Sequence, residues 1–111
     1  MTISSHVLDT SIGRPAAGIE IRLSALDAGG SWGERDRART DDNGRVANLG
    51  AGESNGRAYC LSFDVGTYFH ERGVDSFYSL INVEFVITDP EAHYHVPLLV
   101  SPYGYSTYRG S

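Results

Sequence analysis

The feature that most constrains the fold of this chain is a period-two alternation of apolar and polar residues, which recurs along nearly its whole length. It is clearest in GIEIRLSAL (18–26), RAYCLSF (57–63) and INVEFVI (81–87). Side chains point alternately to the two faces of a strand, so each segment is predicted to bury one face and expose the other. In GIEIRLSAL the predicted inward residues are Ile19, Ile21, Leu23 and Ala25.

Turn signals separate these segments and indicate the fold class. The Asn-Gly pair at 43–44 is a strong tight-turn signal, because both residues tolerate positive φ. The segment DVGTYFHERGVD (64–75) breaks the alternation and is predicted as a short helix, with Asp64 or Thr67 as its N-cap and Gly73 as its stop. Seven or eight short strands with one short helix predict an all-β fold, a two-sheet β-sandwich.

Composition narrows the classes of partner and location. The 111 residues, 41% of them hydrophobic, suit one domain spanning residues 1–111. The net charge of −5, without a run of like charges, disfavours nucleic acid and anionic membranes. No apolar run approaches the roughly 20 residues of a membrane span, and the first residues lack a signal-peptide pattern. The single cysteine, Cys60, is predicted to be buried rather than catalytic, and a cytoplasmic location is expected.

Two strands carry histidine and leucine on the face that should meet water. The predicted core face of HYHVPLLVS (93–101) consists of Tyr94, Val96, Leu98 and Val100. Its other face includes His93, His95 and Leu99. In SSHVLDT (4–10), Val7 points inward, which leaves His6 and Leu8 outside. Scattered apolar residues on a surface are ordinary; the alternative is that both faces are buried between subunits and line a cavity there.

The C-terminal segment YSTYRGS (105–111) continues the alternation. If Tyr105 and Thr107 pack inward, Tyr108 faces the same side as His95. Chain ends are usually frayed and plain. The patterned end is therefore predicted to form part of an interface and a wall of the same site.

Two motifs suggest other chemistry, and their context disfavours both. GGSWG (29–33) matches the G-x-S-x-G pattern of hydrolases, which needs a strand-to-helix turn above a parallel sheet. A charged run follows it here, so Ser31 is predicted to lie in a turn between two strands. His93 and His95, two residues apart on a strand, point the same way and can share a zinc ion, but a catalytic site needs a third ligand and only His6 is available. No metal is predicted.

The residues quoted so far form a pattern that resembles the transthyretin-like family, on its branch that hydrolyses 5-hydroxyisourate. The resemblance covers essentially the whole chain. It rests on SSHVLDTSIGRPAAG, TDDNGR, HYHVPLLVSPYGYSTYRGS and Trp32. The ending Tyr108-Arg109-Gly110-Ser111 is its most specific element, because hormone-carrying transthyretins lack this ending and the histidines.

The resemblance implies an assembly, a site and a reaction. Two edge-to-edge dimers would pack face to face as a homotetramer, with active sites at the mouths of the channel between them. Hydrolysis of a cyclic amide in 5-hydroxyisourate would give 2-oxo-4-hydroxy-4-carboxy-5-ureidoimidazoline, without a cofactor. The implied catalytic residues are His6, Arg45 and His95. The implied substrate-binding residues are Tyr108, Arg109, Gly110 and Ser111.

These residue types suit such a reaction. A neutral imidazole, of His95 or His6, takes the proton of the attacking water, and the other histidine orients water or substrate. The guanidinium of Arg45 holds the planar ring and stabilises the developing oxyanion. Tyr108 would close the channel. Two alternatives remain at this stage: a carrier of flat aromatic ligands without chemistry, and a sandwich used for adhesion or assembly.

Overall fold

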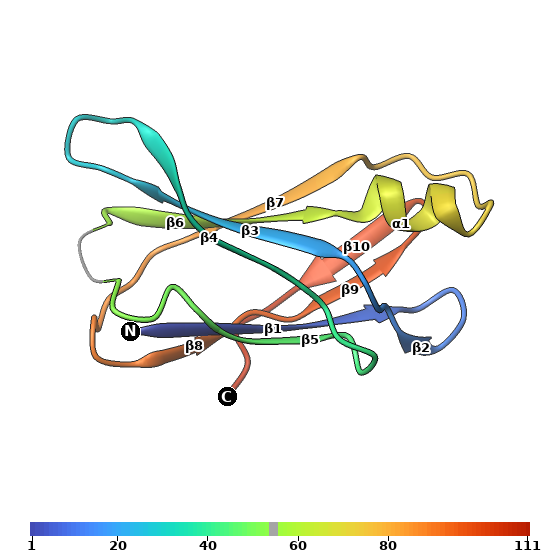
Figure 1. The fold of residues 1–111 in the computed structure, drawn as a ribbon, viewed down its shortest axis with the longest axis horizontal. Coiled ribbons are helices and arrows are strands. Elements are labelled where there is room, and N and C mark those ends of the chain that lie inside the picture. Colours follow the sequence, from blue (N-terminus) through green and yellow to red (C-terminus); the bar gives the residue numbers. More distant parts are fainter. Residues whose placement is uncertain (54–55) are drawn as a thin grey trace.

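The computed structural model, which describes residues 1–53 and 56–111, consists of two β-sheets packed face to face (Figure 1). The β3 sheet has the order β4-β3-β6-β7 and comprises β3 (Glu20–Leu26), β4 (Trp32–Arg39), β6 (Ala58–Asp64) and β7 (Leu80–Phe85). The β1 sheet has the order β10-β9-β1-β2, and β5 and β8 also pair with β1. Its strands are β1 (Thr2–Asp9), β2 (Arg14–Pro15), β5 (Arg45–Leu49), β8 (His93–His95), β9 (Leu98–Ser101) and β10 (Gly104–Thr107).

The predicted β-sandwich is confirmed, although the described residues form ten strands rather than seven or eight. One reason is that the segment 93–101 is divided into β8 and β9. Pro97 lies in the gap between them and has no amide hydrogen to donate to a neighbouring strand. The other reason is β2, a pair of residues too short to stand out in the sequence pattern.

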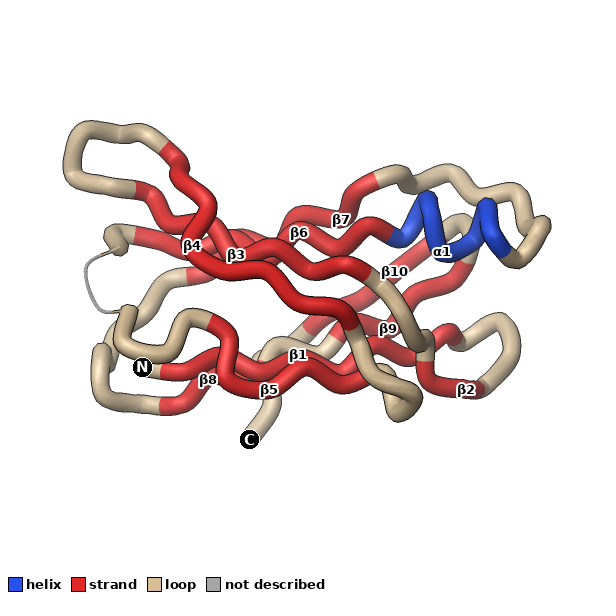
Figure 2. The backbone as a smooth tube through the Cα atoms, viewed as in Figure 1, coloured by secondary structure: helices blue, strands red, loops and turns tan. Residues whose placement is uncertain are grey.

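The single helix of the described chain also follows the prediction (Figure 2). Helix α1 (Val65–Glu71) begins after Asp64, whose carboxylate accepts a hydrogen bond from the backbone amide of Thr67 at 3.2 Å. It ends before Gly73, which has a φ of 70°. Among the described residues, no helix is long and apolar enough to cross a membrane.

The core lies between the sheets and is built from the predicted inward faces. The four inward residues predicted in segment 18–26, of which Ile19 precedes β3 and the other three lie in it, are at most 1% exposed. The even-numbered residues of 94–100 are also buried. Cys60 is an exception to the sequence prediction: it is only half-buried. It alternates with the buried residues Tyr59 and Leu61 and therefore points to the outer face of the β3 sheet.

A buried hydrogen bond ties α1 to the β1 sheet. The hydroxyl of Tyr68 donates to the carboxylate of Asp9 at 2.9 Å, and Asp9 is only 1% exposed. Burial, followed by this bond and the negative charge of Asp9, raises the pKa of Tyr68 to about 12. The backbone amide of Ser11 donates a second hydrogen bond to Asp9 at 3.0 Å. The hydroxyl of Ser11 donates to the same oxygen, Oδ1, whereas Tyr68 donates to Oδ2, so Oδ2 keeps this donor only while the helix is docked.

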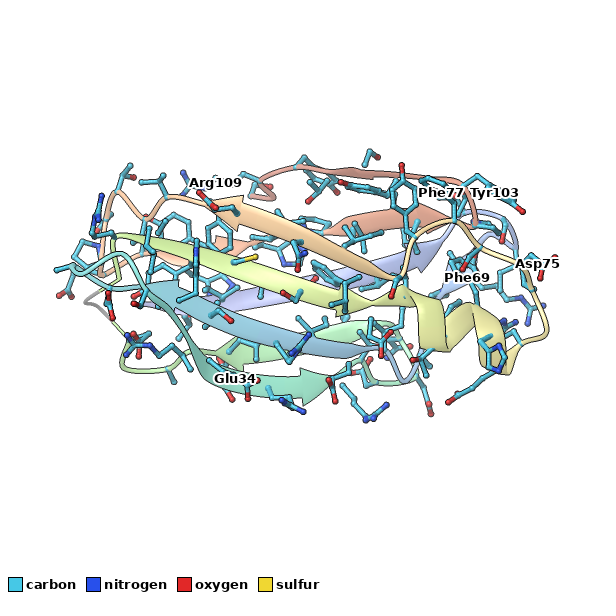
Figure 3. The ribbon with its side chains drawn as sticks, turned by 90° about the horizontal axis from the view of Figure 1, so that it is seen from above. Glu34, Phe69, Asp75, Phe77, Tyr103 and Arg109 are labelled. Carbon is cyan, nitrogen blue, oxygen red and sulfur yellow. The ribbon has the colours of Figure 1, made fainter. Side chains whose placement is uncertain are left out.

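We expect Tyr68→Phe to lower the free energy of unfolding by about 1–3 kcal/mol, because the buried carboxylate of Asp9 loses a donor. Urea denaturation measures this change. Tyr103→Phe is the matched control, since that ring is 70% exposed near Phe77 at the edge of the molecule (Figure 3). Equal stability of the two variants would contradict a stabilising role for the Tyr68–Asp9 bond.

Candidate active site

The strand register brings the three predicted catalytic residues to one side of the β1 sheet. β1 and β5 are antiparallel, with His6 directly opposite Arg45. β1 and β8 are parallel, with Ser4 opposite His95. Residues 3, 5 and 7 of β1 are buried, so the even-numbered residues point away from the core, as the alternation predicted. The two histidines and the arginine thus come from three adjacent strands.

A pocket of about 300 Å³ lies on this outer side, and we call it the histidine pocket. Arg45 and His95 both line it, together with Ser111 from the C-terminal tail. His6 stands beside Arg45 without being one of the lining residues. The complete lining is Ser4, Ser5, Arg45, Val46, Ala47, His93, His95 and Ser111.

The environment of His95 favours a neutral imidazole. Burial lowers the pKa of His95 from its usual 6.5, and the positive charges of Arg45, His6 and His93 lower it further. One ring nitrogen, Nδ1, lies 2.7 Å from the Ser4 hydroxyl. At neutral pH the ring therefore carries a lone pair that is able to accept a proton.

The C-terminal tail reaches His95 through Gly110 and Ser111. The Gly110 amide donates to the carbonyl oxygen of His95 at 2.7 Å, which extends the β1 sheet by an isolated bridge. A Cβ atom at position 110 would lie 2.5 Å from His95 Cδ2, so only glycine fits against the imidazole without displacing it. Two of the four predicted tail residues therefore contact or line the site.

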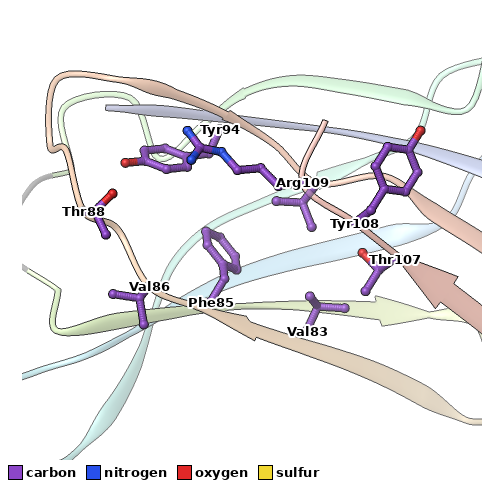
Figure 4. Close-up of a pocket in the computed structure, with 9 residues that line it drawn as sticks. Val83, Phe85, Val86, Thr88, Tyr94, Thr107, Tyr108 and Arg109 are labelled. Carbon is purple, nitrogen blue, oxygen red and sulfur yellow. The ribbon is translucent and has the colours of Figure 1, made fainter. Parts of the chain in front are cut away.

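Arg109 lies elsewhere in this chain, at a second pocket of about 290 Å³ that we call the inter-sheet pocket (Figure 4). Its guanidinium packs over the ring of Tyr94, 4.6 Å from the centroid. The alternation of β10, continued two residues past its end at Thr107, explains this position, because Arg109 and Thr107 then share one side and both line the inter-sheet pocket. The inter-sheet pocket is lined by Val83, Phe85, Val86, Thr88, Tyr94, Val96, Thr107, Tyr108 and Arg109.

Tyr108 borders the same pocket, but its ring is turned away from Val83 and Phe85 (Figure 4). It is 58% exposed and is not part of the lining of the histidine pocket. The substrate-binding roles of Tyr108 and Arg109 therefore stay predictions.

Two polar residues next to the site were not predicted as functional: Ser4 and His93. The Ser4 hydroxyl lies 2.7 Å from His95 Nδ1 and 2.8 Å from His93 Nε2. The sequence contains a signal for them, since Ser4 and His6 share a face of one strand and His93 and His95 share a face of another. What the pattern lacks is the pairing of those two strands.

The other two motifs lie away from this chemistry. Ser31 is exposed in the turn between β3 and β4, where its amide donates to Asp27 at 2.9 Å, so the predicted turn is confirmed. Within the described ranges, no three His, Cys, Asp or Glu side chains are grouped as metal ligands would be. The pair His93 and His95 is instead joined through the hydroxyl of Ser4.

The fold is a sandwich of a six-stranded and a four-stranded sheet, and a pocket with imidazole and guanidinium groups lies on an outer face. This is the architecture of transthyretin-like proteins. The model of the HIUase/Transthyretin family matches residues 3–110, and the chain belongs to that family. The resemblance inferred from the sequence motifs is thereby confirmed.

Similar proteins include both branches of the family. 5-Hydroxyisourate hydrolase 2 of Rhizobium meliloti (strain 1021) is 46% identical over 116 residues, which cover 98% of this chain and 95% of the relative. The solved structure of Klebsiella pneumoniae 5-hydroxyisourate hydrolase is 36% identical with a TM-score of 0.85, covering 99% of this chain and 93% of the other. Sea bream transthyretin in complex with thyroxine is 27% identical with a TM-score of 0.89, covering 99% and 95%. Fold alone therefore does not separate hydrolase from carrier, whereas sequence identity is higher to the hydrolases.

Proposed function

We propose that the protein hydrolyses 5-hydroxyisourate to 2-oxo-4-hydroxy-4-carboxy-5-ureidoimidazoline, a step of urate degradation. The observation that carries this proposal is a histidine of lowered pKa, His95, in one pocket with the guanidinium of Arg45. Relatives that share nearly the whole chain bear the name 5-hydroxyisourate hydrolase, and they support the same assignment. No cofactor enters the proposed reaction.

The proposed mechanism divides the work among the residues of the histidine pocket. Neutral His95 accepts a proton from water as that water attacks the carbonyl carbon of the cyclic amide. The C–N bond of the ring then breaks, and protonated His95 returns the proton to the departing nitrogen. Arg45 binds the planar ring and stabilises the negative charge that develops on the carbonyl oxygen. His6, opposite Arg45 in the sheet, orients water or substrate. The tail from Tyr108 to Ser111 completes the substrate site in this proposal.

The direct experiment is to generate 5-hydroxyisourate with uricase and to follow its decay by absorbance with and without the protein. Accelerated decay that scales with protein concentration supports the proposal. Unchanged decay refutes it and leaves the non-catalytic carrier of flat aromatic ligands as the better hypothesis. A carrier has no use for a neutral imidazole beside a guanidinium, so that alternative is less favoured by the pocket.

We expect the hydrolytic rate to fall at acidic pH, with its midpoint below 6.5. The pKa of His95 is lowered, so the ring stays neutral to a lower pH than a free histidine, and protonation below that pH removes the lone pair of the base. Initial rates measured between about pH 5 and pH 8 give this profile. A midpoint above 6.5, or a rate that rises as the pH falls, would contradict a neutral His95 as the base.

The proposed assembly is a homotetramer, a dimer of dimers, of single-domain chains (residues 1–111) in the cytoplasm. The support is the outer face of the β1 sheet. Leu8 and Leu99 lie opposite each other there on paired strands, near the histidines, and both are half-exposed. A second copy that covers this face would bury both leucines and enclose the histidine pocket. We expect sedimentation velocity to give the mass of four chains, and a stable monomer at micromolar concentration would contradict the shared site.

A further inference from the structure

A chain of side-chain hydrogen bonds runs from His95 toward solvent. The Ser4 hydroxyl joins Nδ1 of His95, at 2.7 Å, to Nε2 of His93, at 2.8 Å. The Thr2 hydroxyl lies 2.6 Å from the other nitrogen of His93, Nδ1. The parallel register of β1 and β8 produces this order, because it sets Thr2 opposite His93 and Ser4 opposite His95. His93 is exposed, whereas His95 is half-buried.

This chain has two self-consistent directions, because each hydroxyl has one hydrogen and each neutral imidazole has one N–H. In the first, Nδ1–H of His95 donates to Ser4, Ser4 donates to Nε2 of His93, and Nδ1–H of His93 donates to Thr2. In the second, every bond is reversed. The first direction leaves Nε2 of His95 without a proton, whereas the second puts a proton there.

The charges around the ring favour the first direction. Nδ1 of His95 is engaged by Ser4, so Nε2 is the nitrogen left for the pocket. The guanidinium of Arg45 lines that pocket and is close enough to lower the pKa of His95. A nearby cation attracts a lone pair and repels an N–H dipole. His6, another titratable group that acts on His95, adds positive charge when protonated and works in the same sense. The first direction requires a neutral His93, because Nε2 of His93 accepts the hydrogen bond from Ser4.

We propose that Ser4, supported by His93, is a positioning residue that holds His95 in its Nδ1–H tautomer, so that Nε2 of His95 is the general base. The inference deepens the proposed hydrolysis and rests on it for the role of the base. It also selects between the two histidines. His95 has a partner that fixes its tautomer, whereas no side-chain hydrogen bond to His6 is found among the described residues. A fixed tautomer matters because the wrong one presents N–H where the reaction needs a lone pair.

The kinetic test compares Ser4→Ala, Ser4→Thr and His93→Ala in the full-length protein. Ser4→Ala is expected to lower kcat on the order of 10- to 100-fold with little change in KM, the scale typical for loss of a group that orients a functional histidine. Ser4→Thr keeps the hydroxyl and should restore most of the rate, and His93→Ala should give a smaller loss than Ser4→Ala. The matched control is Ser62→Ala on the outer face of the β3 sheet, where the hydroxyl donates to Asn82 at 2.6 Å, and its rate should equal the wild-type rate.

A spectroscopic test needs no substrate. The ring ¹⁵N chemical shifts of His95 in the wild-type protein should show a protonated Nδ1 and an unprotonated Nε2, and Ser4→Ala should move the population toward Nε2–H. A wild-type His95 found mainly as Nε2–H overturns the proposal, as does a full rate in folded Ser4→Ala. If the wild-type protein leaves 5-hydroxyisourate decay unchanged while Nδ1 of His95 is protonated, the proposed function fails and the positioning by Ser4 stands. The two failures are thus distinguished.

Discussion

We expect His95→Ala to lower the turnover of 5-hydroxyisourate by about 10²- to 10⁴-fold while the protein stays folded. The imidazole is the group of lowered pKa in the histidine pocket. The other histidine of the lining, His93, is exposed, and both of its ring nitrogens are engaged by the hydroxyls of Thr2 and Ser4. The ring of His95 points away from the core residues Tyr94 and Val96, so its removal should cost little stability. Steady-state rates, with circular dichroism as a check of the fold, measure both parts of the prediction.

Two further histidine variants make this result specific. His6→Ala should also reduce turnover severely, because it removes the imidazole opposite Arg45, but it should keep the acid limb of the pH profile if His95 is the base. His70→Ala is the matched control, an exposed histidine in α1 that should leave the rate unchanged. A near-wild-type rate in His95→Ala would remove that residue from the mechanism.

Much of the fold was predictable because the information is local. Alternation alone identified the buried faces of β3 and of residues 94–100. The sequence left Asp64 and Thr67 as candidate caps of the helix, and the structure has Asp64 in that position. The division of β8 from β9 also had a local signal, since Pro97 cannot donate to a ladder. The half-buried position of Cys60 follows from the same alternation, because Cys60 lies between the inward residues Tyr59 and Leu61 and so points outward.

The site was predictable only in part, because it depends on which strands pair. His6, Arg45 and His95 came from a family resemblance, and the register then placed all three on one sheet. Ser4 could not be connected to His95 by pattern, since 91 residues separate them and the parallel pairing of β1 with β8 is non-local. Arg109 shows the opposite case: the alternation that includes Thr107 points it toward Tyr94, whereas the family motif grouped it with the histidines.

The second large effect is expected from deletion of residues 108–111, which should reduce turnover by about 100-fold or more. The deletion removes the tail that packs against His95, and a displacement of a catalytic group by about 1 Å typically costs this much. The last strand, β10, ends at Thr107, and residues 108–111 contribute nothing to the buried core. The truncated protein loses the contact of Arg109 with Tyr94, which is worth only about 0.5–1 kcal/mol at an exposed site. Thermal unfolding, sedimentation and turnover, compared with the full-length chain, separate folding from activity.

A single methyl group tests the same idea without truncation. Gly110 packs against the imidazole so closely that a Cβ would lie 2.5 Å from Cδ2 and 3.1 Å from Cγ of His95, so Gly110→Ala must push the ring or the tail aside. Gly104→Ala is the matched control on β10, because its Cβ would meet only the Ser101 hydroxyl, at 3.7 Å. We expect Gly110→Ala to lose a large part of the turnover and Gly104→Ala to keep it. If the truncated protein and Gly110→Ala both turn over substrate at the wild-type rate, the tail is only a packing segment, and the position of His95 does not depend on it.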